Sequence, residues 1–137
     1  MAEQLKAELA APADVTEDML SKYELIGFGS GIYNRKHHQS LFDMLKRLPD
    51  QAEKKAFIFS TNSCGPGYFS EQLHKPLRDA LKQKGFRVLG EYCCKGFMDH
   101  SFIKWFDGGI NKEHPDKNDL ERAKAFVENL RPHFLIR

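Results

Sequence analysis

The sequence predicts an α/β fold, in which a parallel sheet is covered by helices on both faces in three α/β/α layers. Strand-like and helix-like segments alternate along the chain, and residues 55–59 form a continuous apolar run typical of a strand buried on both faces. The chain of 137 residues fits one compact domain, which we place at residues 1–137.

The first strand–helix unit spans residues 23–48. Residues 23–29 are predicted to be a short apolar strand that opens into a Gly/Ser turn. A helix follows from about Lys36 to Leu48, because Leu41, Leu45 and Leu48 have helical spacing, and Pro49 ends it.

In the second unit, the strand at 55–59 stops at residues 60–67, a dense run of turn formers. The next helix carries Leu73, Leu77, Ala80 and Leu81 and is closed by Gly85. Pro76 is expected in the first turn of its regular part, or at a kink.

The third unit begins with residues 86–92, whose partial alternation indicates a strand near a sheet edge. A long polar loop follows, and its aromatic residues Phe102, Trp105 and Phe106 are assigned a packing role. Asp116 is the expected N-cap of a last helix, with one apolar face formed by Leu120, Ala123, Val127 and Leu130.

Composition excludes several functional classes. The 21 basic and 19 acidic residues are mixed along the chain, which argues against a nucleic-acid binder. No apolar run approaches the roughly 18 residues that span a bilayer, and no secretory signal is recognisable at the start, so we expect a cytoplasmic protein that does not contact membranes.

The chain offers little metal or thiol chemistry. The three cysteines include no CxxC pair, so we expect reduced and inert thiols. The adjacent His37 and His38 would point in different directions, with no third ligand placed by the sequence, so they are expected to face solvent or to lie near a cofactor rim. No metal site and no catalytic acid, base or nucleophile is predicted.

Three segments together resemble the flavodoxin family. Residues 23–33 (YELIGFGSGIY) are similar to the family's third strand and the loop beside the flavin ring, and residues 57–61 (FIFST) resemble its fourth strand. Residues 90–97, with 108–112 and 115–116, resemble the fifth strand and the following loop of short-chain members. The resemblance runs from about Tyr23 to Leu130 and implies a flavodoxin-like domain that binds FMN.

The sequence departs from the family at its start. The family's first strand and phosphate-binding loop have no counterpart, so we expect an N-terminally truncated flavodoxin-like domain. Residues 2–10 read as the back half of a helix, and Ala13–Thr16 as a weak second strand. The family's strand order would then leave a gap inside the sheet. We favour a longer natural protein, in which Met1 is an internal methionine mistaken for the start. The alternatives are a rearranged sheet, a second subunit that fills the gap, and a degenerate remnant of the fold.

The resemblance implies two cofactor-binding loops at the carboxyl ends of strands. In the first, Tyr33 would stack on the flavin, whereas the pattern alone favours an ordinary surface loop. The second would supply backbone N–H donors, and its Cys64 is expected to be inert. The candidate residues are Ser30, Gly31, Ile32, Tyr33, Ser60, Thr61, Asn62, Ser63, Cys64 and Gly65.

The implied function is FMN-dependent electron transfer between redox partner proteins, more as a carrier than as an enzyme. Two alternatives stay open. One is an FMN-dependent NAD(P)H or quinone reductase on the same fold, although no GxGxxG motif is present. The other is a truncated domain that binds another protein and no flavin. The sequence is also compatible with a homo-oligomer.

Overall fold

The computed structural model describes residues 1–63, 65–96 and 115–133, and three parallel strands form its centre. β1 (Leu25–Tyr33), β3 (Lys54–Asn62) and β4 (Phe86–Lys95) pair in parallel. A two-residue strand, β2 (Lys36–His37), turns back antiparallel to the end of β1. The sheet order is β2-β1-β3-β4, so β4 is an edge strand, as predicted.

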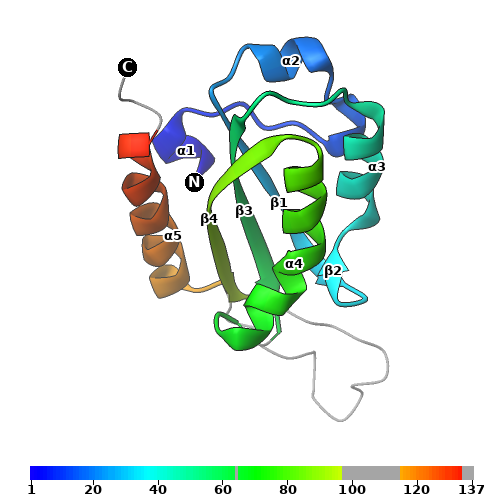
Figure 1. Ribbon diagram of the computed structural model, residues 1–137. Coiled ribbons are helices and arrows are strands. Elements are labelled where there is room, and N and C mark those ends of the chain that lie inside the picture. Colours follow the sequence, from blue (N-terminus) through cyan, green and yellow to red (C-terminus); the bar gives the residue numbers. More distant parts are fainter. Residues whose placement is uncertain (64, 97–114, 134–137) are drawn as a thin grey trace.

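Helices cover both faces of this sheet (Figure 1). α3 (Gln39–Arg47) and α4 (Tyr68–Gln83) lie on one face. α5 (Lys117–Leu130) lies on the other, next to α1 (Ala2–Leu5). The short elements are η1 (Pro12–Asp14), α2 (Glu17–Ser21) and η2 (Arg131–His133). The predicted class is therefore confirmed as an open, mostly parallel sheet between two helical layers.

The two faces of the sheet bury different side chains. Toward α3 and α4, aliphatic residues pack tightly, and Ile58, Leu77 and Leu81 have no exposed surface. Toward α5 the contacts are aromatic, because the Phe126 ring lies 6.0 Å from Phe57 and 5.6 Å from Tyr92. Such tilted and edge-on ring pairs add to the free energy gained from burial alone.

Glycines on β1 make room for these aromatic rings. A Cβ added at Gly27 would lie 2.4 Å from Cζ of Phe57, and one at Gly29 would lie 2.1 Å from Cε2 of Phe59. Both rings thus lie directly against the β1 backbone. A larger residue at either position would have to displace a packed ring.

Most predicted core positions are correct, but two details differ. Leu41, Leu45 and Leu48 are buried, and Asp116 caps α5 by accepting a hydrogen bond from the Asp119 amide at 2.8 Å. Leu120, however, is 56% exposed, because Asp119 takes the buried place on that side of α5. Pro76 lies inside α4, well past its first turn.

The predictions for the N-terminal segment are wrong. The helix there covers only Ala2–Leu5, and residues 12–14 form a 3-10 turn that begins at a proline, where a strand was expected at 13–16. The expected gap would have lain between that strand and β1, so it has no counterpart where residues 13–16 form no strand. The chain passes from α1 to η1, which contacts α3 on the opposite face, and so crosses the outer edge of β1.

In the part of the chain that the structure describes, no helix combines the length and the apolar character needed to cross a bilayer.

Replacing Gly29 by Ala should destabilise the protein by about 1–3 kcal/mol, because the new methyl group overlaps the Phe59 ring. Urea unfolding measures this loss. Gly31→Ala is the matched control on the same strand, since the atoms nearest to its Cβ would belong to the exposed Tyr33 side chain, at 3.2 Å. Equal losses for both variants would contradict the close approach of Phe59.

Candidate functional site

The carboxyl ends of the three parallel strands bring the predicted loops together. Ser30 on β1 is in register with Ser60 on β3, which is in register with Cys93 on β4. One residue further, Gly31, Thr61 and Cys94 form a second row. Ligands of such sheets bind beyond the carboxyl ends of the strands, so the fold places the predicted residues where a binding site is expected.

At the end of β1, an exposed aromatic ring borders a cavity. Tyr33 is 57% exposed, and its ring contacts that of His38 edge-on at 5.3 Å. Ser30 fixes this turn, because its hydroxyl donates to the Gly31 carbonyl at 2.6 Å and accepts from the His38 amide at 2.9 Å. The cavity measures about 410 Å³ and is lined by Tyr33, Asn34, Lys36, His37, His38 and Gln39. Ile32, also predicted, is half-buried and pairs with His37.

At the end of β3, the loop is shaped by Asn62. Its side chain accepts a hydrogen bond from the Gly65 amide at 2.7 Å and donates to Sγ of Cys93 at 2.8 Å. Gly65 has a φ of +74°, which disfavours any other residue there. Thr61 and Ser63 are half-buried, and the predicted Cys64 lies outside the described residues.

Ser60 points away from the strand ends, into a buried polar network. Its Oγ lies 2.5 Å from Nε2 of His74 on α4, and Nδ1 of His74 lies 3.2 Å from Oε1 of Glu91 on β4. Glu91 in turn accepts two hydrogen bonds from the Arg78 guanidinium, at 2.8 and 3.1 Å. If Nδ1 donates to the carboxylate, Nε2 is left to accept from the Ser60 hydroxyl.

The charges in this network are matched. Burial acts to raise the pKa of Glu91, but hydrogen bonds from His74 and Arg78 outweigh burial and hold that pKa below its ordinary value. Glu91 is therefore ionised at neutral pH, with a partner on each side.

The arrangement has the serine–histidine–carboxylate order of hydrolytic triads, but its surroundings do not suit that chemistry. Ser60 is only 2% exposed. A cavity of about 460 Å³ beside β4 is lined by His74 and Glu91 but not by Ser60. The hydroxyl thus bonds the buried side of the imidazole, and we assign the network a structural role.

A second buried histidine lies beside this network, and it corrects a prediction. His37 was expected near solvent, yet it has no exposed surface, and its ring lies 5.0 Å from that of His74. Its Nε2–H donates to the Phe59 carbonyl at 3.1 Å, and no described residue pairs with its buried Nδ1. The two-residue strand β2 turns this side chain inward, whereas His38 stays exposed as expected.

Thiol and metal chemistry find no support among the described residues. Burial raises the pKa of Cys94 to about 11, so its thiol is protonated and inert at neutral pH. Residues 1–63, 65–96 and 115–133 contain no cluster of three His, Cys, Asp or Glu side chains placed to hold a metal ion.

Sequence reasoning missed His74, Arg78 and Glu91. A signal for His74 was present, because it lies three residues before Leu77 and seven before Leu81, on the same buried side of α4. No such signal pairs Glu91 with α4, since that contact depends on how helix and strand pack.

Acid should destabilise the protein through His37. Burial lowers its pKa to about 4, below the value of about 6.5 in the unfolded chain, so the unfolded chain binds a proton that folded His37 excludes. The contribution of neutral His37 to the free energy of unfolding is then fully present above about pH 6.5 and is lost toward pH 4. The loss between pH 7.5 and pH 5 is about 2 kcal/mol. Urea unfolding at both pH values measures the loss. His37→Gln should remove this dependence, and an unchanged pH slope in that variant would contradict the assignment.

Comparison with known proteins gives one relative and no function. No family model and no solved structure matches the sequence. The chain is 45% identical over 130 residues to the uncharacterized protein MJ0298 of Methanocaldococcus jannaschii. This alignment covers 95% of the chain and 84% of MJ0298. At this identity and coverage, the chain belongs to the same protein family as MJ0298.

Proposed function

We propose that this protein is a flavodoxin-like, FMN-binding electron-transfer protein that exchanges electrons with redox partner proteins. The observation that carries the proposal is the meeting of the two predicted loops at one sheet edge, with exposed Tyr33 beside a cavity of about 410 Å³. That volume lies within the range of small-molecule sites. The arrangement of helices on both faces of a mostly parallel sheet is compatible with the flavodoxin-like fold.

The described residues fit the ring end of FMN. Tyr33 offers an exposed aromatic face for stacking, and its position at the end of β1 is set by the Ser30 hydrogen bonds. The loop after Asn62 is held in place by the hydrogen bond from the Gly65 amide to the Asn62 side chain. Ser60 would contribute only its backbone, because His74 takes its hydroxyl.

The same residues provide few favourable interactions for the phosphate group of FMN. At the start of α3, the His38 ring already accepts the Ser40 amide at 3.2 Å. α4 and α5 carry Glu71 and Asp119 in their first turns, and carboxylates there repel an anion. The bound flavin would supply the electron chemistry, while these residues would position its ring and shield it from water.

Fluorescence titration of the purified chain tests flavin binding. We expect quenching of FMN with a micromolar Kd, and circular dichroism confirms that the protein is folded. A folded chain that leaves FMN fluorescence unchanged would contradict the proposal. Rapid NADH or NADPH oxidation by the loaded protein would instead make it a reductase.

Tyr33→Ala should weaken FMN binding about tenfold, because stacking on an aromatic side chain contributes about 1–3 kcal/mol per ring. Tyr33→Phe keeps the ring and is the matched control, so it should bind within about twofold of the wild type. Since Tyr33 is exposed, neither change should affect folding. Equal affinities for all three proteins would show that the flavin does not stack at Tyr33.

Riboflavin should bind within about threefold of FMN, because the described helix starts are capped or acidic and give the phosphate no charge-assisted hydrogen bond. Parallel titrations with the two flavins measure the ratio. A preference for FMN above about tenfold would mean that other groups hold the phosphate, while the ring site itself could still stand.

A further inference from the structure

The outer edge of β1 is only partly paired. β2 pairs with Ile32 and Tyr33, and the Ser30 hydroxyl takes the His38 amide. Among the described residues, no backbone hydrogen bond reaches residues 25–29 apart from the ladder with β3. Outward-pointing N–H and C=O groups of a sheet edge form a template for one more strand.

An apolar cavity of about 180 Å³ lies along this part of β1. Leu25, Ile26 and Gly27 line it on the sheet side, with Phe57 and Phe59. Val15, Met19, α1 and the segment 7–10 complete the lining, and this segment contributes the Glu8 carboxylate, which accepts a hydrogen bond from the Tyr23 hydroxyl. The rest of the lining is mostly apolar, which favours apolar groups in the cavity.

β1 lacks the charged residues, prolines and bulges that protect many natural edge strands from pairing. Residues 25–33 contain no charged side chain and no proline, and the β1–β3 register shows no bulge. Charges, prolines and bulges are the usual means of blocking an edge. Leu9, at the cavity rim, is 82% exposed, which adds apolar surface to the same region.

We infer that this slot, the outer edge of residues 25–29 with the adjoining cavity, binds an extended, uncharged, apolar segment of a partner polypeptide as an additional strand. Only an extended backbone satisfies alternating donors and acceptors along an edge, and the apolar walls select apolar side chains. Five residues span about 16 Å, which sets the length of the segment.

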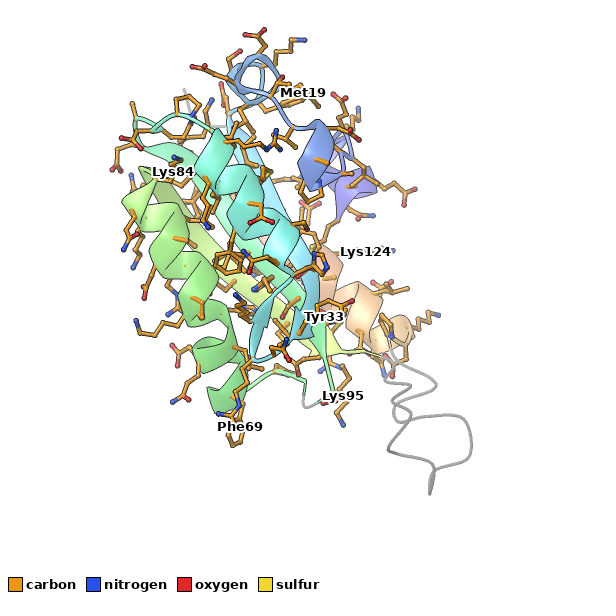
Figure 2. The ribbon with its side chains drawn as sticks, turned by 90° about the vertical axis from the view of Figure 1, so that its right-hand side faces the viewer. Met19, Tyr33, Phe69, Lys84, Lys95 and Lys124 are labelled. Carbon is orange, nitrogen blue, oxygen red and sulfur yellow. The ribbon has the colours of Figure 1, made fainter. Side chains whose placement is uncertain are left out.

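A single segment fits better than the sheet edge of a second copy. The chain between α1 and η1 crosses the outside of β1, and its residues 7–10 form the outer wall of the cavity. A separate peptide would have to move only this wall, which the Tyr23 hydroxyl holds by donating a hydrogen bond to Glu8, whereas another folded sheet would have to displace it entirely. Figure 2 shows Met19, which lines the slot, near the top of the molecule, and Tyr33 well below it.

A synthetic peptide tests the inference. The probe is the fluorescein-labelled peptide Lys-Val-Leu-Ile-Val-Thr-Lys, and the control peptide has the same sequence with N-methyl groups on its Leu and Ile. We expect anisotropy to report binding in the micromolar range and at least tenfold weaker binding of the control, which lacks two backbone donors. Hydrogen exchange should show protection at residues 25–29 when the probe binds.

Two protein variants locate the site. Leu9→Glu should weaken peptide binding about tenfold, because it puts a charge at the apolar rim, and the 82% exposure of Leu9 makes the change compatible with folding. Leu120→Glu is the matched control on α5, where Leu120 is 56% exposed, and should leave binding unchanged.

Several outcomes would overturn the inference. They are a folded wild type that does not bind the probe, equal binding of the N-methylated peptide, and protection outside residues 25–29. Sedimentation of the chain alone adds a fourth. A dimer whose residues 25–29 are protected without peptide would make a second copy the occupant of the slot.

Discussion

The hydrogen-bonded chain from Ser60 through His74 and Glu91 to Arg78 fixes the carboxyl ends of β3 and β4 against α4. It joins three elements by polar contacts inside a layer that is mostly apolar. Loss of one partner leaves a buried polar group unpaired, which costs about 1–3 kcal/mol. Because the second candidate loop, residues 60–65, leaves the sheet at the end of β3, its position depends on this network.

β1 depends on a second constraint, the close approach of aromatic rings to its backbone. Phe57 and Phe59 occupy the space where side chains at Gly27 and Gly29 would lie. The glycines therefore let β3 side chains cover two strands at once, and they leave β1 with few side chains on that face. Leu25, Ile26 and Gly27 of this strand line the apolar cavity.

Much of the architecture could be predicted from local patterns. The apolar run Ala56–Ile58 and the leucine spacing of α3 correctly predicted burial, because each residue's environment follows from its place in a regular element. The predictions failed where packing between elements determines whether a side chain is buried or exposed. His37 is buried because a two-residue strand turns it inward, and Leu120 is exposed because Asp119 caps the helix. Likewise, the sequence places Ser60 in the candidate site, but in the structure its hydroxyl is hydrogen-bonded to His74.

The two proposals draw on different parts of β1 and can fail independently. The flavin proposal rests on its carboxyl end, where Ser30 and Tyr33 stand. The strand slot rests on residues 25–29 and on the cavity next to α2. A strand added parallel to β1 would end at the same sheet edge as Ser30 and Ser60, because the carboxyl ends of parallel strands meet at one edge. Residues that follow such a strand would then lie beside Tyr33, at the carboxyl ends of the strands. The described helix N-termini near this end provide no favourable site for an anion. Filling the slot is therefore a physical route by which a partner segment would add polar groups to the flavin site without altering the three strands that form it.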